Sequence, residues 1–180
     1  MSEATMETKV REVVARQLGV EKYFLKIDGI KGESQDKNHV GELELVSYGW
    51  GVEAATVTTG GAGQRIGRST FQDFQFGAKA SKAGPQLMLH CATGTRIKQV
   101  VLTGARATDA AARDYLKITL SDVVVTSYAS SVSGGDGAAP MDTASVRFGK
   151  IDVEYRETRP DGQPGETVKT GYDLAKAVRG

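Results

Sequence analysis

The residues that come nearest to a chemical motif are one histidine and two carboxylates, His39 with Asp36 and Glu42. An imidazole beside carboxylates can act as a general base or contribute to a metal site. Both kinds of site need a third converging group, and the neighbouring sequence offers none. The run 31–39 is polar throughout, which favours a solvated loop between two strands. A hydrolase centred on His39 therefore ranks last among the functions considered.

Two further patterns resemble chemical sites but lack the required geometry. His90 and Cys91 are neighbours on a predicted helix, where adjacent side chains diverge by about 100°. Cys91 is therefore interpreted as a small apolar residue. The glycine-rich run 60–67 lacks the spacing of a dinucleotide fingerprint, and a strand pattern over 71–76 follows it instead of a helix. We interpret this run as a flexible loop, and we predict no catalytic residue, no metal ligand and no cofactor.

Aromatic residues suggest a different class of function. Tyr48 and Trp50 flank Gly49 on a predicted strand, where two rings could stack on a small ligand. This pattern defines the alternative interpretation, a monomeric β-barrel ligand-binding module that uses Tyr48 and Trp50. Packing of the two rings in a core or an interface is the stronger interpretation.

In the elements that must position these residues, apolar and polar side chains repeat with a period of two. From Tyr23 onward, apolar and polar residues alternate in short runs, most clearly over 115–121, and each run indicates a strand with one buried face. The stretch 145–155 changes parity between Phe148 and Ile151. A β-bulge at Gly149–Lys150 would let one long strand keep its apolar side inward.

Two segments depart from the strand pattern. Pro85 and Gly94 bracket a short helix, and residues 5–18 place Val10, Val13 and Leu18 on one helical face. We therefore predict an N-terminal extension over residues 1–20, helical or partly disordered, followed by one β-rich domain over residues 21–180. No internal repeat marks a second domain.

Composition sets the broad class. The chain has 180 residues, 39% of them hydrophobic, and a formal net charge of +1. A basic field that would attract nucleic acid is absent, and no run has the roughly 18 apolar residues that membrane insertion needs. One cysteine cannot form an internal disulfide, and the N-terminal run lacks a secretory signal pattern. A cytoplasmic protein before any assembly is the prediction.

Several strings of residues resemble one family. These strings follow the family's order over residues 23–172: Tyr23-Phe-Leu-Lys-Ile-Asp-Gly-Ile-Lys-Gly-Glu-Ser34, Asp36-Lys37, His39, Gly41-Glu42, Ser47-Tyr-Gly-Trp-Gly51, Pro85-Gln-Leu-Met-Leu-His-Cys-Ala-Thr-Gly94, Leu120-Ser-Asp-Val-Val-Val-Thr-Ser127 and Val146 to Tyr155. The chain resembles the haemolysin-coregulated protein (Hcp) family, the tube subunit of type VI secretion.

The resemblance implies a mainly β fold, a small antiparallel β-barrel of two sheets with one short external α-helix. It also implies a structural protein without enzymatic activity, which forms homo-hexameric rings that stack into a tube. Such a tube carries and chaperones small secreted effectors in its lumen, and it is exported in bacterial competition and virulence. The implied partners are copies of the chain itself, contractile sheath proteins, a VgrG-type spike protein and the effectors.

The resemblance also suggests two surfaces. The loop over 31–41 corresponds to one that reaches toward the neighbouring ring, so we predict an inter-ring contact at Asp36, Lys37, Asn38 and His39. The strand that carries Tyr48, Gly49 and Trp50 corresponds to one that faces the lumen, which makes these three residues candidates for contact with effectors. Export through the type VI apparatus would place the protein outside the cell without a signal peptide.

Overall fold

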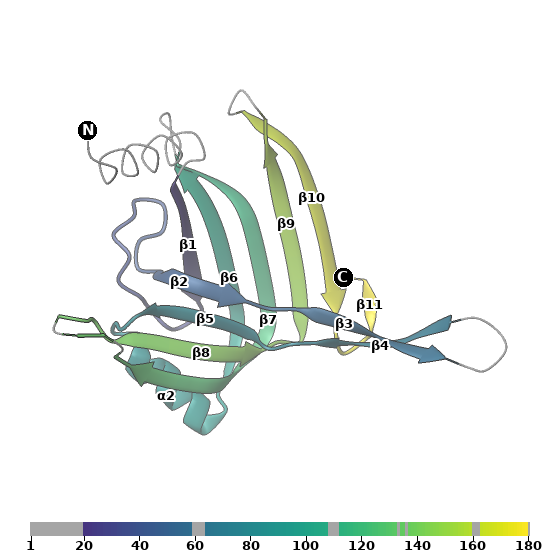
Figure 1. Ribbon diagram of the computed structural model, residues 1–180, viewed down its shortest axis with the longest axis horizontal. Coiled ribbons are helices and arrows are strands. Elements are labelled where there is room, and N and C mark those ends of the chain that lie inside the picture. Colours follow the sequence, from purple (N-terminus) through teal and green to yellow (C-terminus); the bar gives the residue numbers. More distant parts are fainter. Residues whose placement is uncertain are drawn as a thin grey trace.

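Almost all regular structure in the protein is antiparallel β-sheet (Figure 1). The computed structural model describes residues 20–58, 64–107, 112–132, 134–135, 137–159 and 163–179. The predicted N-terminal extension lies outside these residues, apart from Val20. The elements are β1 (Val20–Ile27), β2 (Leu43–Gly49), β3 (Val52–Thr58), β4 (Gln64–Phe71), β5 (Phe74–Lys79), α2 (Gly84–Thr93), β6 (Arg96–Ala107), β7 (Ala112–Ser131), β8 (Met141–Arg147), β9 (Lys150–Thr158), β10 (Pro164–Asp173) and β11 (Val178–Arg179).

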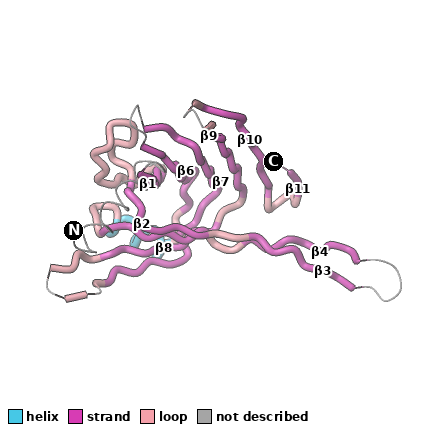
Figure 2. Tube along the Cα trace, turned by 45° about the horizontal axis from the view of Figure 1, so that its top comes forward, coloured by secondary structure: helices cyan, strands magenta, loops and turns pink. Residues whose placement is uncertain are grey.

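Six strands close into a barrel. The neighbours run β1–β2–β5–β8–β7–β6, and β6 pairs with β1 to complete the circle. The predicted barrel is therefore confirmed, but its predicted division into two sheets is wrong, because the β7–β8 pairing joins all six strands in one sheet. The separate second sheet is the hairpin β3–β4, which projects beyond the barrel (Figures 1 and 2).

The longest strand, β7, has three partners. It pairs with β6, with β8 over its second half, and with β9 over its first half. Strands β10 and β11 continue the sheet outward from β9. This three-stranded flap, β9–β10–β11, was not predicted from the sequence, since alternation alone does not reveal which strands pair.

Residues inside the barrel follow the predicted alternation. Ile118 and Leu120 of β7 are 2% and 1% exposed, whereas Lys117, just before them, is exposed. Phe24 is an exception, because its parity places it on the outer face of β1 and yet it is fully buried. The loop between β1 and β2 covers it there.

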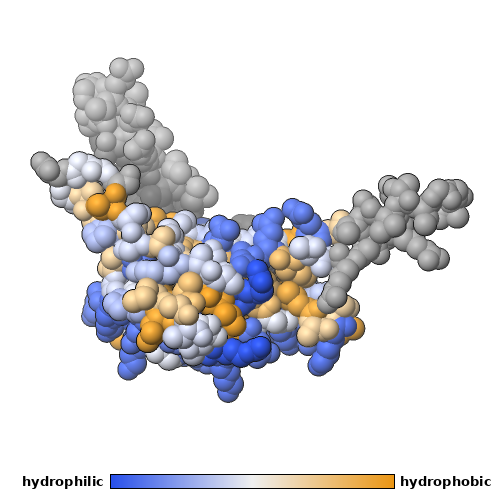
Figure 3. Space-filling view, turned by 90° about the horizontal axis from the view of Figure 1, so that it is seen from below, coloured by the Kyte–Doolittle hydropathy of each residue, from blue (hydrophilic) through white to orange (hydrophobic). Residues whose placement is uncertain are grey.

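The predicted short helix is present outside the barrel as α2. Pro85 occupies its first turn, and Gly94 ends it with a left-handed φ of 64°. Leu87 is 1% exposed and joins the core, while Met88 and Leu89 point outward. The face seen from below mixes hydrophobic and hydrophilic residues (Figure 3). No helix among the described residues is long and apolar enough to cross a bilayer.

The glycine-rich run predicted as a flexible loop is partly a strand. Residues 64–67 belong to β4, where Ile66 pairs with Thr56 of β3. The prediction was wrong for these residues because the glycines concealed a pairing that only the opposite strand reveals.

The predicted β-bulge within one long strand is instead a break between two strands, because β8 ends at Arg147 and β9 begins at Lys150. Both strands lie along β7, and the amide of Gly149 donates to the carbonyl of Ser121 at 2.9 Å. The residue in the left-handed region is not the glycine but its neighbour across the sheet, Asp122, with φ 54°. Since both strands change parity here, Val123 and Phe148 stay inside.

Replacing Gly149 should test this kink. A Cβ at Gly149 would lie 3.2 Å from the Cβ of Asp122, which is tighter than ordinary packing allows. We expect Gly149→Ala to lower the free energy of unfolding by about 1–2 kcal/mol in urea titrations. Gly135→Ala, with open space around it, is the matched control and should change little. Equal effects of the two variants would contradict this account.

Candidate assembly interface

The loop between β1 and β2 is folded rather than merely solvated. Its two arms are held together by backbone hydrogen bonds, since the amide of Gly32 donates to the carbonyl of Gly41 at 2.8 Å and that of Gly41 donates to Ser34 at 2.9 Å. A Cβ at Gly32 would overlap the backbone of Glu42, so only glycine fits there. Further along, the amide of Asn38 donates to Asp36 Oδ1 at 3.0 Å. These bonds give the loop one shape.

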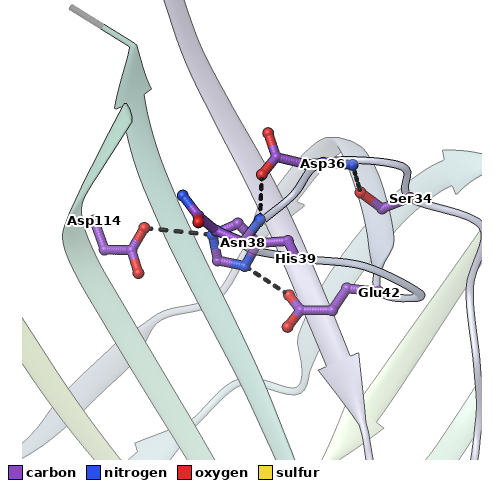
Figure 4. A network of polar contacts seen from close by, with 6 residues as sticks. All are labelled: Ser34, Asp36, Asn38, His39, Glu42 and Asp114. Atoms are coloured by element: carbon purple, nitrogen blue, oxygen red, sulfur yellow. Dashed lines mark hydrogen bonds and ion pairs between the residues drawn. The ribbon is translucent and has the colours of Figure 1, made fainter. Parts of the chain in front are cut away.

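The side chain of His39 pins this loop to the barrel (Figure 4). It is 6% exposed, and its ring stacks on Phe24 with 4.2 Å between centroids. Nδ1 lies 3.1 Å from Glu42 Oε2, and Nε2 lies 3.3 Å from Asp114 Oδ1 on β7. Asp114 is the third group that the local sequence did not offer, 75 residues further along the chain.

This cluster is built for structure, not for catalysis. One face of the imidazole is covered by Phe24, and both ring nitrogens already have carboxylate partners. The side chain of Asp36 is not part of it, because Asp36 accepts from Asn38 instead. No group of three or more His, Cys, Asp or Glu side chains in the described part of the chain could hold a metal ion.

The predicted inter-ring residues fall into two groups. Lys37 and Asn38 are exposed at the tip of the loop, and Asp36 is half-buried. His39 is buried under that tip in its own subunit. A contact with another ring remains a prediction for this loop, and the structure gives His39 a supporting position within it.

The predicted lumen-facing residues do not form an open aromatic platform. Tyr48 is half-buried, with its ring 5.1 Å from Tyr23 and 6.0 Å from Phe74, and burial raises the pKa of its hydroxyl. Trp50 also packs against the core, whereas Gly49 is exposed with open space beside it. These contacts remove the basis for a ligand module that stacks on Tyr48 and Trp50.

A shallow groove of about 390 Å³ crosses the sheet beside Gly49. It is lined by residues without formal charge: Ser47, Tyr48, Gly49, Gln75, Phe76, Ser127, Thr143, Ala144 and Ser145. The groove belongs to β2, β5, β8 and the second half of β7. This part of the barrel therefore presents uncharged side chains to whatever faces it.

A second polar network lies near the N-terminal end of β1, next to Tyr48. Glu21 Oε1 accepts from Nη2 of Arg106 at 2.7 Å, and Glu21 Oε2 accepts from the hydroxyls of Tyr23 at 2.8 Å and Tyr115 at 3.1 Å. The guanidinium lies over the Tyr115 ring, 4.7 Å from its centroid. Tyr115 occupies a register shift opposite Gly104, which leaves room for both tyrosines. The Arg106 hydrogen bond is the main reason that the pKa of Glu21 is lowered.

The hairpin β3–β4 leaves the barrel from an aromatic base. Phe71, at the end of β4, stacks on Tyr172 at 5.2 Å and meets the edge of Phe148 at 6.1 Å. The amide of Gln72 donates to the carbonyl of Gly51 at 2.9 Å, which closes the base. Beyond this point the ribbon extends away from the body (Figure 2). Sequence reasoning missed the hairpin, and the only signal was the weak alternation on either side of the glycines.

The lowered pKa of Glu21 makes stability depend on pH. A carboxyl whose pKa is depressed by folding contributes stability above its ordinary value of 4.5, and this contribution is lost as the pH falls. We expect the loss of stability between about pH 7 and about pH 4 to be smaller in Glu21→Gln than in the wild type. Urea titrations at both pH values measure it. Glu166→Gln, an exposed change on β10, should leave the loss unaltered, and the same result for Glu21→Gln would refute the role of Glu21.

Comparisons with known proteins agree with this geometry. The family model "Type VI secretion system effector, Hcp" matches residues 24–155. Protein hcp1 of Pseudomonas aeruginosa is 32% identical over 157 residues, which cover 87% of this chain and 96% of that protein. The crystal structure of Hcp1 from Salmonella typhimurium has a TM-score of 0.73 and 30% identity, over 88% of this chain and 98% of that one.

A second solved structure, of a type six secretion system protein, has a TM-score of 0.83 at 19% identity and covers 89% of this chain and all of that one. It supports the fold alone. The extent of the family match and the identity to Protein hcp1 establish the family as well as the fold. The chain belongs to the Hcp family, the non-enzymatic tube proteins of type VI secretion.

Proposed function

We propose that this chain forms hexameric rings, that the rings stack into a hollow tube, and that the tube carries and shelters small effectors on the way out of the cell. Membership of the Hcp family provides the tube function. The ring, its stacking and its cargo are the proposal, as are a contractile sheath around the tube and a VgrG-type spike at its tip. The chain would assemble in the cytoplasm and leave through the apparatus itself.

The observation that carries the proposal is the hairpin β3–β4. A two-stranded ribbon on its own is marginally stable in water, because it has no third strand and no second layer. This ribbon projects away from its barrel beyond Phe71 (Figure 1). A neighbouring copy is the natural support, since a head-to-tail contact repeated around an axis closes a ring. A monomer would leave the ribbon without support.

The flap supports the same interpretation. In the described part of the chain, β10 pairs with β9 on one side and, on the other, with β11 only at Tyr172 and Asp173. An open edge of this kind promotes unwanted pairing unless something covers it. Tyr155 and Val168, which pair across β9 and β10, are 46% and 60% exposed. Both features fit a surface that another subunit covers.

The groove beside Gly49 suits transport rather than tight binding. Its uncharged residues would let many different effectors pass, because no fixed charge in the groove selects one partner and repels another. If this surface faces the lumen, Tyr48 and Gly49 line it. The packing of Tyr48 and Trp50 against the core would then fix the shape of the lumen wall, and Gly49 would be the exposed residue of the three.

Ring formation can be tested by light scattering and negative-stain imaging of the purified chain. The wild type should give annular particles with six-fold symmetry, whereas Phe71→Ala should shift the population toward monomers because the hairpin loses its aromatic base. Val132→Ala, which changes an exposed apolar residue elsewhere, is the control and should leave rings intact. Thermal unfolding shows whether the Phe71→Ala barrel is still folded. A wild type that is monomeric at every concentration would refute the proposal.

The inter-ring role of the loop needs a separate variant. Asp36→Lys combined with Lys37→Glu should spare the hexamer and reduce stacking, measured by sedimentation of tubes. Lys37→Glu alone keeps the bond from the amide of Asn38 to Asp36 and should act in the same direction. The control exchanges the two charges of the ion pair between Lys150 and Asp152. Stacking that is unchanged in both loop variants would show that the loop is not an inter-ring contact.

A further inference from the structure

Both nitrogens of the buried His39 ring face carboxylate oxygens. A neutral imidazole carries one N–H, so it can donate to Glu42 or to Asp114 but not to both. Its other nitrogen would then hold a lone pair against a carboxylate, at 3.1 or 3.3 Å. An imidazolium donates to both carboxylates, and hydrogen bonds between charged groups are roughly twice as strong as neutral ones. The geometry therefore fits the protonated ring.

The two carboxylates differ in their surroundings. The side chain of Glu42 is 17% exposed and belongs to the same loop as His39, three residues away. The side chain of Asp114 is 56% exposed and belongs to β7. A neutral ring would keep its bond to the enclosed Glu42 and release Asp114, which water can solvate. The contact that depends on the proton is thus the one that joins the loop to the barrel.

Other groups around the ring do not replace this contact. From β1, the ring meets the apolar face of Phe24, and from the loop, Asp36 contributes its backbone carbonyl, which accepts from the His39 amide. Arg113 of β7 and Arg156 of β9 line the same groove as Asp114, with Asn38 at its rim.

We propose that protonated His39 is a latch that holds the loop 31–42 on β7, and that loss of the proton loosens the loop. The latch is closed at lower pH and opens as the pH rises, because only the imidazolium satisfies both carboxylates. The consequence of the latch for assembly rests on the proposed function. Since Lys37 and Asn38 form the proposed inter-ring contact, rings would stack better with the latch closed.

The chain allows a clean test, because it has two histidines and the other, His90, lies on α2, where its Nδ1 is 2.8 Å from the carbonyl of Gln86. In a His90→Asn background, selective labelling leaves one histidine signal, and the nitrogen shifts report its protonation. Across a pH series we expect the imidazolium signal to give way to a neutral one as the pH rises. Amide exchange in 32–42, corrected for intrinsic rates, should lose about tenfold of its protection over the same series.

Asp114→Asn, also in the His90→Asn background, is the decisive variant. An asparagine amide can donate to the lone pair of a neutral imidazole, so this loop should stay docked at high pH and its protection should lose its pH dependence. A histidine that is neutral throughout, or protection that follows pH equally in the Asp114→Asn variant, would overturn the latch.

Sedimentation of tubes measures the link to assembly separately. If the latch opens and stacking does not respond, the link to assembly is wrong, whereas failure to form rings at any pH would refute the proposed function and leave the loop measurement valid.

Discussion

Strand β7 is shared by two parts of the molecule, and the paired kink at Asp122 and Gly149 is what makes this sharing possible. Before the kink, β7 pairs with β9 and supports the flap, and after it, β7 pairs with β8 and closes the barrel. Because both strands change parity together, apolar side chains of β7 stay inside on both sides of the kink, from Ile118 to Val125. The close approach of the two residues leaves little room for a Cβ at position 149.

The loop 31–42 depends on the same strand. Its shape comes from local backbone hydrogen bonds, but its position comes from Phe24 beneath it and Asp114 beside it. A buried imidazole between two carboxylates is a demanding arrangement, since every donor and acceptor must be satisfied once water is removed. That demand gives the loop one position on the barrel.

The two polar networks described above join parts of the fold to one another. The Glu21, Arg106 and tyrosine network ties β1 to β6 and β7, and the His39 cluster ties the loop to the barrel. The features that remain for function are surfaces: a projecting hairpin, an exposed flap and an uncharged groove. All three are features of a protein whose activity is assembly with copies of itself.

Local patterns in the chain determined much of this in advance. Alternation identified the buried face of β7, proline and glycine marked the ends of α2, and the parity change located the kink near Gly149. These signals depend on neighbouring residues and on burial, so they can be read from sequence. The burial of Phe24, the pairing of His39 with Asp114, the left-handed Asp122 and the projection of β3–β4 depend on residues far apart in the chain. Only the closed barrel brings those residues together, and for that reason the tertiary structure alone decided them.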